Sequence, residues 1–134
     1  MRRLVLALGA ISLLACGDSS GPGASSAIGT WSLVTINGSP LPYTAFLIQP
    51  SYRLEILSAT FVAAENGTYF GSITTRETVD GTVTTTTEPD NGTWSQVGNT
   101  LTITDSDQFT STATISGNTI TLSEEGFVSV YQRQ

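Results

Sequence analysis

Turn-forming dipeptides interrupt this chain at short intervals and leave little room for long helices. Most of them place glycine after asparagine or aspartate, which suits tight hairpins because both central residues of such turns take a positive φ. The intervening segments are rich in threonine, valine, isoleucine and aromatic residues, which favour strands. The dipeptides are Asn37-Gly38, Asn66-Gly67, Asp80-Gly81, Asn91-Gly92, Gly98-Asn99 and Gly117-Asn118. We therefore predict an all-β domain.

The spacing of the turns predicts a series of short strands. In several of them apolar and polar residues alternate, so that one side of the strand faces a core. In the predicted strand 52–64, the alternating positions of the apolar residues shift by one after Ile56, which predicts a bulge or bend near Leu57-Ser58. The hairpin around Asp80-Gly81 is polar on both faces, so we expect its outer part to project beyond the core or to lie at an edge. The predicted strands are 29–36, 43–48, 52–64, 67–78, 82–89, 92–96, 100–105, 108–116, 118–124 and 126–133.

The start of the chain carries a targeting pattern. Two arginines follow Met1, and an apolar run covers residues 4–15, which is shorter than the roughly 20 residues of a membrane span and typical of a signal peptide. Leu13-Leu14-Ala15-Cys16 resembles the lipobox of bacterial lipoproteins. The resemblance implies cleavage before Cys16, diacylglycerol on its thiol and an acyl chain such as palmitate on the new amino group. Two or more lipid chains anchor a protein stably. An ordinary secretory peptide with an incidental Cys16 is the alternative.

These features divide the chain into three parts. Residues 1–15 are the predicted signal peptide, and residues 28–134 form the folded domain. Residues 16–27 comprise the lipidated cysteine and a flexible linker rich in glycine and serine. Gly17 stands where an aspartate would retain a lipoprotein in the inner membrane. We therefore expect a lipid-anchored protein of the cell envelope, at the outer membrane and facing the periplasm or the cell surface rather than at the inner membrane.

The residue types present exclude several classes of function. The chain has no histidine and no lysine, and Cys16 is its only cysteine. Histidine–serine triads, thiol catalysis, Cys/His zinc sites and intradomain disulfides therefore lack their residues. Removal of residues 1–15 leaves three arginines against eleven acidic residues, a formal charge of −8, which disfavours nucleic acid as a partner. We expect no enzymatic activity and no cofactor.

Two acidic pairs are candidates for a hard cation. They are Asp105-Ser106-Asp107 and Glu124-Glu125, and both flank predicted turns. Calcium needs six to eight oxygen ligands, more than either pair supplies. We therefore interpret both as solvated turns and predict no metal site.

The ends of the predicted domain resemble those of lipocalins. Gly29-Thr30-Trp31 opens the first strand and Arg133 closes the last, like the G-x-W motif and terminal arginine of that family. The resemblance implies a small antiparallel up-and-down β-barrel of eight to ten strands, in which Trp31 closes one end and Arg133 packs across it in a cation–π contact. A wider pattern resembles uncharacterised lipocalin-like lipoproteins of environmental bacteria. It comprises Gly29-Thr30-Trp31, Asn37-Gly38-Ser39-Pro40-Leu41-Pro42, Asn91-Gly92-Thr93-Trp94-Ser95, Gly98-Asn99-Thr100-Leu101-Thr102 and Val130-Tyr131-Gln132-Arg133-Gln134.

Such a barrel has little spare room. Eight tilted strands enclose a space roughly 16 Å across between backbones. Inward side chains would fill much of this width, and those we predict are Trp31, Leu54, Phe61, Leu101, Phe109 and Ile120. Either a small apolar ligand fits in one mouth of the barrel, or the core is filled.

We accordingly expect a membrane-tethered, non-catalytic binding module. Its ligand would be a small apolar molecule, a lipid or an envelope polymer. The most apolar stretch of the domain supplies a candidate ligand or partner patch, with an edge strand or a cap over the core as the alternative; the patch comprises Tyr43, Phe46, Leu47 and Ile48. A second hypothesis is an interaction with an envelope protein, such as inhibition of a periplasmic protease, for which residues 17–28 would have to enter the protease cleft.

Overall fold

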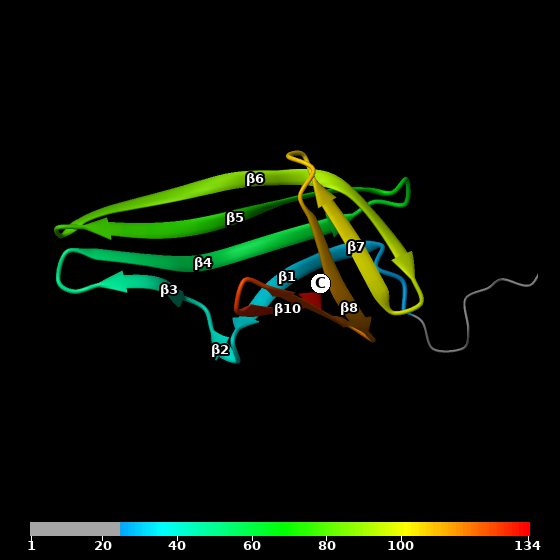
Figure 1. The fold of residues 1–134 in the computed structure, drawn as a ribbon, viewed down its shortest axis with the longest axis horizontal. Coiled ribbons are helices and arrows are strands. Elements are labelled where there is room, and N and C mark those ends of the chain that lie inside the picture. Colours follow the sequence, from blue (N-terminus) through cyan, green and yellow to red (C-terminus); the bar gives the residue numbers. More distant parts are fainter. Residues whose placement is uncertain (1–24) are drawn as a thin grey trace, which may run out of the picture.

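Residues 25–134, the part of the chain that this computed structural model describes, form strands joined by turns and short loops (Figure 1). Within this part no helix is long and apolar enough to cross a membrane. The predictions for Cys16 and for the linker up to residue 24 lie outside the described residues. The strands are β1 (Gly29–Ile36), β2 (Ser39–Pro40), β3 (Tyr43–Ile48), β4 (Tyr52–Ala63), β5 (Thr68–Val79), β6 (Thr82–Val97), β7 (Thr100–Asp105), β8 (Thr110–Ser116), β9 (Thr119–Glu124) and β10 (Phe127–Arg133).

Eight of these strands close into an antiparallel barrel. Neighbours follow the order β1-β10-β9-β8-β7-β6-β5-β4, and β4 pairs with β1 to complete the ring. This closing pair joins only Gly29–Ser32 to Thr60–Ala63. Further along, β1 pairs with β2 and β4 pairs with β3 instead. The barrel is therefore closed at one end and splayed at the other, and the predicted fold class is confirmed.

Three strands extend well past the barrel, as Figure 1 shows. β4 and β5 have 12 residues each and β6 has 16, whereas β7 to β10 have six or seven. Their outer halves and β3 form a projecting sheet, which includes an ion pair of 2.9 Å between Arg76 Nε and Glu55 Oε2. The predicted polar hairpin around Asp80-Gly81 is the tip of this sheet. The predicted bulge lies in β4 between Ile56 and Ser58, where the barrel begins.

One predicted turn is wrong. Asn91-Gly92 lies inside β6, which runs without a break, so the predicted strands 82–89 and 92–96 are one. Gly92 is needed for packing, because a Cβ there would lie 2.9 Å from Cε1 of Tyr69 and collide with the carbonyl oxygen of Thr104. The glycine therefore permits close contact with β5 and β7 on both sides of β6.

The hydrophobic core is concentrated at the closed end. Trp31, Leu101 and Ile115 are completely buried there. Two side chains that we predicted to fill the barrel do not do so. Leu54 lies on the projecting part of β4. Phe109 lines the space at the splayed end but is 58% exposed and does not fill it.

Candidate functional site

The closed end of the barrel brings Trp31 and Arg133 together. The guanidinium carbon lies 4.2 Å from the centroid of the indole ring, within the range of a cation–π contact. Nη1 of Arg133 donates a hydrogen bond of 2.8 Å to the carbonyl oxygen of Ile28, and Nε1 of Trp31 donates one of 2.8 Å to that of Ala27. These contacts hold Trp31 and Arg133 across this end of the barrel.

The same end holds the chain segment that leads into the domain. Ala27, at the end of the predicted linker, is fully buried, and its amide donates to the side-chain oxygen of Gln96 at 3.0 Å. Nε2 of Gln96 in turn donates to the carbonyl oxygen of Ser25 at 2.6 Å. The chain therefore reaches the barrel at its closed end.

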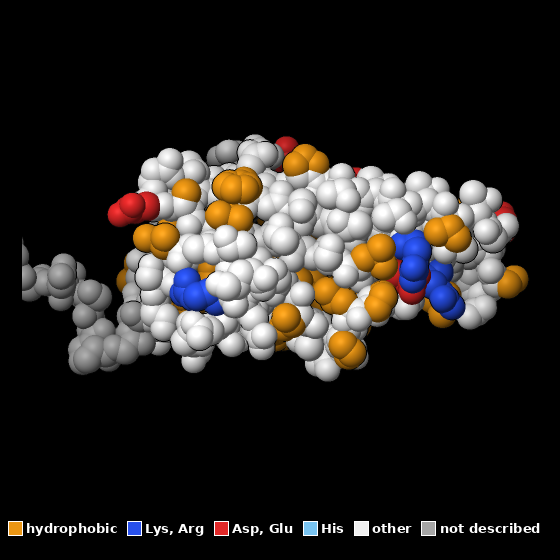
Figure 2. All heavy atoms as spheres, turned by 180° about the vertical axis from the view of Figure 1, so that it is seen from behind, with side chains coloured by type: hydrophobic (Ala, Val, Ile, Leu, Met, Phe, Trp, Pro, Cys, Tyr) orange, Lys and Arg blue, Asp and Glu red, His pale blue; other side chains and the backbone are white. Residues whose placement is uncertain are grey.

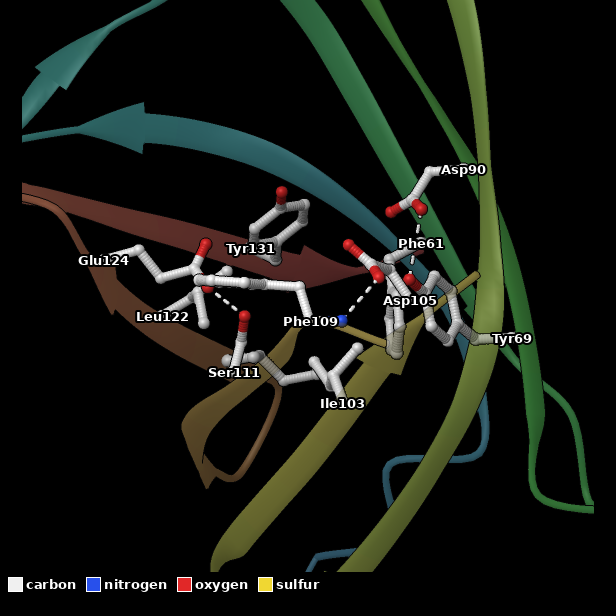
Figure 3. A pocket seen from close by; sticks show the side chains of 11 residues that line it. Phe61, Tyr69, Asp90, Ile103, Asp105, Phe109, Ser111, Leu122, Glu124 and Tyr131 are labelled. Atoms are coloured by element: carbon white, nitrogen blue, oxygen red, sulfur yellow. Dashed lines mark hydrogen bonds between the residues drawn. The ribbon is translucent and has the colours of Figure 1, made fainter. Parts of the chain in front are cut away.

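The splayed end contains a cavity of about 180 Å³ (Figure 3). A more open hollow of about 340 Å³ adjoins it beneath β3 and shares three lining residues with it, Phe109, Leu122 and Glu124. These shared residues place the outer hollow next to the inner cavity, toward the mouth of the barrel. The inner part is lined by Phe61, Tyr69, Asp90, Ile103, Asp105, Phe109, Ser111, Ile120, Leu122, Glu124 and Tyr131.

Aromatic and aliphatic side chains make up most of the cavity wall. The rings of Phe61 and Tyr69 lie 5.2 Å apart between centroids. Tyr131 stands across the cavity from them, and its hydroxyl points into the same space (Figure 3). Burial, together with the nearby carboxylates of Asp90 and Glu124, raises the pKa of Tyr131 to about 12. The wall thus offers flat apolar surfaces and a protonated phenol.

Carboxylates from three different strands also line the cavity. Oδ1 of Asp90 on β6 accepts a hydrogen bond of 3.1 Å from the hydroxyl of Tyr69. Oδ1 of Asp105 at the end of β7 accepts one of 2.9 Å from the amide of Phe109. Oε1 of Glu124 at the end of β9 accepts one from the hydroxyl of Ser111. In each case the protein engages one carboxylate oxygen only.

No positive charge balances these carboxylates within the cavity wall, since none of its lining residues is a lysine, arginine or histidine. The effect is visible at Glu124, whose pKa is raised above its usual value, first by burial and then by Glu125, Asp105 and Asp90. Burial and Asp90 likewise raise the pKa of Tyr69. The cavity is therefore apolar in its walls and negative in its potential.

The sequence matches a known domain family over residues 28–124, which include strands β1 to β9. That family is the lipocalin-like domain. The chain belongs to the lipocalin-like domain family. No curated protein matches the sequence. The lipocalin-like barrel is typically a fold that binds small hydrophobic ligands rather than one that catalyses reactions.

The predicted apolar patch lies outside the inner cavity of this lipocalin-like domain. Phe46, Leu47 and Ile48 are about half exposed on the edge strand β3. The hydroxyl of Tyr43 accepts a hydrogen bond of 3.0 Å from Nδ2 of Asn37. Among the residues of β3, only Ala45 lines the outer hollow. On the face that Figure 2 shows, apolar side chains lie in small separate groups with polar atoms between them.

The acidic turns of the domain have structural roles of their own. Oδ1 of Asp105 accepts hydrogen bonds of 2.9 Å from the amides of Asp107 and Phe109 and so holds the turn between β7 and β8. Across residues 25–134 no three acidic, histidine or cysteine side chains are grouped so as to hold a metal ion.

We did not predict that Asp90, Asp105 and Glu124 converge, although the alternation along two strands places Asp105 and Glu124 on the inward face. Asp105 continues the inward series of Leu101 and Ile103, and Glu124 continues that of Ile120 and Leu122. Extension of each apolar series by one more step would have directed both carboxylates into the barrel.

Glu124 provides a test of this electrostatic description. Its folded-state pKa lies above the unfolded value, so the protonated carboxyl favours folding at low pH and this contribution is lost as the pH rises through the folded pKa. We expect Glu124→Gln to raise the free energy of unfolding at pH 7 by up to about 1 kcal/mol, and the gain to vanish in acid. Urea titrations from pH 4 to pH 8 measure this, with the exposed Glu65→Gln as the control. A Glu124→Gln variant that is less stable than wild type at pH 7 would contradict the description.

Proposed function

We propose that this protein is a non-catalytic binding module of the cell envelope, which takes a small and largely apolar ligand into the splayed end of its barrel. The cavity carries this proposal. Its inner part alone is smaller than the roughly 300 Å³ at which ligand pockets usually begin. The outer hollow of about 340 Å³ shares lining residues with it. A ligand can therefore place one end inside the barrel and the remainder in the mouth.

We propose further that lipid on Cys16 anchors the module, at the outer membrane rather than at the inner one. The lipobox Leu13-Leu14-Ala15-Cys16 supports the anchor. The contact between Gln96 and Ser25 at the closed end supports an anchor on that side of the barrel. With the lipid linked to the closed end, the opposite mouth of the barrel is left open to a ligand.

Mass spectrometry of the full-length protein, purified from the membranes of its own host, tests both parts of the proposal. We expect the intact mass to show Cys16 at the N-terminus with diacylglycerol and an acyl chain, and Cys16→Ser to move the protein from the membrane to the soluble fraction. Native spectra are expected to show a retained small molecule. An unmodified Cys16 would overturn the anchor. A cavity that retains nothing and binds no apolar probe would overturn the ligand-binding function.

A further inference from the structure

The geometry of the cavity points to a ligand that is an organic cation, in which an ammonium group is attached to an apolar body. This inference rests on the proposed function and names the chemical class of the ligand. Three features of the same cavity support it: the charge of its wall, the aromatic rings that surround it, and the oxygen atoms of its carboxylates that have no partner.

The charge of the wall bears on any ligand that enters. Asp90, Asp105 and Glu124 face the cavity and no cationic side chain lines it. A neutral apolar ligand would displace water from these carboxylates and offer nothing in return, and loss of hydration without a partner is costly for a charged group. A ligand with its own positive charge removes this cost, since the only compensating cation would be the ligand itself.

The aromatic rings form a second feature. Phe61, Tyr69, Phe109 and Tyr131 surround the space into which the carboxylates point (Figure 3). Aromatic faces attract organic cations, and sites for quaternary ammonium groups are commonly lined by such rings. The partly buried hydroxyl of Tyr131 has no hydrogen-bond partner within residues 25–134, although it points into the cavity. Its oxygen is available to accept a hydrogen bond from an ammonium group.

The hydrogen bonds of the carboxylates show how a cation would be held. Tyr69, the amide of Phe109 and Ser111 each occupy one oxygen of a carboxylate. The second oxygens, Oδ2 of Asp90, Oδ2 of Asp105 and Oε2 of Glu124, have no partner in the described part of the chain. The protein thus orients each side chain and leaves one acceptor on it for a ligand.

A metal ion fits this arrangement less well than an organic cation does. The carboxylates are not grouped as metal ligands in residues 25–134, and a bound calcium ion needs six to eight oxygens close around it. An organic cation makes no such demand, because its charge can be shared among several N–H or N–CH₃ groups and its apolar body can contact the rings.

Three probes with the same phenylbutyl body separate charge from apolar contact. They are 4-phenylbutylamine, 4-phenylbutan-1-ol and 4-phenylbutanoate, and their affinities for the full domain can be measured by calorimetry at pH 7. We expect the amine to bind about tenfold more tightly than the alcohol or better, as hydrogen bonds to charged groups imply, and the carboxylate to bind most weakly. The advantage of the amine over the alcohol should shrink between about 10 mM and about 500 mM salt, and as the pH falls and Glu124 is protonated.

A matched pair of variants locates the effect. Asp90→Asn with Glu124→Gln removes two charges from the cavity but keeps the oxygens that accept from Tyr69 and Ser111. We expect it to bring the affinity of the amine down to that of the alcohol, while unchanged binding of the alcohol shows that the barrel is intact. Glu65→Gln with Asp80→Asn removes the same charge from exposed positions away from the cavity and should leave the amine's advantage unchanged.

The outcomes separate this inference from the function on which it rests. Equal affinities for the amine and the alcohol would overturn the cationic ligand and leave an apolar binding module. Tight binding of Ca²⁺ that competes with the amine would also overturn it, in favour of a metal site. Failure of all three probes to bind would count against the binding function itself.

Discussion

Replacement of Trp31 by alanine is expected to lower the free energy of unfolding by about 3–5 kcal/mol, as truncations of large buried aromatic residues do. Trp31 is fully buried at the closed end and contacts the core around Leu101 and Ile115. Its loss would also deprive Arg133 of the ring beneath it. Small domains are stable by only about 5–15 kcal/mol, so this loss is a large share of the total stability. Urea denaturation followed by circular dichroism measures the change.

Two further variants separate the contributions of Trp31. Trp31→Phe keeps an aromatic ring but loses the N–H that donates to the carbonyl oxygen of Ala27, so we expect a smaller loss of about 1–2 kcal/mol. Trp94→Ala is the comparison at the second tryptophan, which is only partly buried and donates to the carbonyl oxygen of Ala64 at 3.0 Å. Trp94 packs against the same core, so a Trp31→Ala variant no less stable than Trp94→Ala would show that full burial of Trp31 is not the main source of its contribution.

The strands were predictable because their signals are local. The sequence-based bounds of β1, β3 and β7 agree with the structure to the residue. Turn dipeptides such as Asp80-Gly81 set the ends of the strands, and alternation sets their faces. The slip of phase in β4 was enough to place its bulge near Ser58, because a side chain on the wrong face cannot reach the core.

We predicted closure of the barrel from the resemblance to lipocalins, but not its splay, because the splay depends on contacts between distant parts of the chain. β1 and β4 share only a four-residue pairing before each turns to a different neighbour. No dipeptide marks the point where β4 leaves β1, and β2 is too short to show a pattern. The cavity follows from this divergence. From the sequence we interpreted the turns at Asp105 and Glu124 as solvated, whereas both carboxylates line the cavity.

Gly92→Ala is expected to lower the free energy of unfolding by about 3 kcal/mol, at the upper end of the cost of overpacking. Its φ does not require glycine; the requirement is steric, because an added methyl group would lie 2.9 Å from both Cα of Asp105 and Cε1 of Tyr69. Displacement of the Tyr69 ring would also disturb the wall of the cavity. We therefore expect weaker binding of 4-phenylbutan-1-ol by the same variant, even under conditions in which it remains folded.

Gly98→Ala is the matched control, because close contacts require glycine at position 92, whereas a positive φ favours glycine at position 98. Gly98 takes a φ of +60° and has nothing within 4 Å of the position of an added Cβ. A left-handed conformation costs an alanine about 1 kcal/mol, so Gly98→Ala should be the milder change and should leave ligand binding intact. If Gly98→Ala proved the more damaging of the two, the tight contact of β6 with β5 and β7 would not be the reason for glycine at position 92. Asn91-Gly92 and Asp80-Gly81 look alike in the sequence, but only Asp80-Gly81 forms a turn. The comparison of Gly92→Ala with Gly98→Ala therefore measures the cost of steric crowding against the cost of a left-handed backbone.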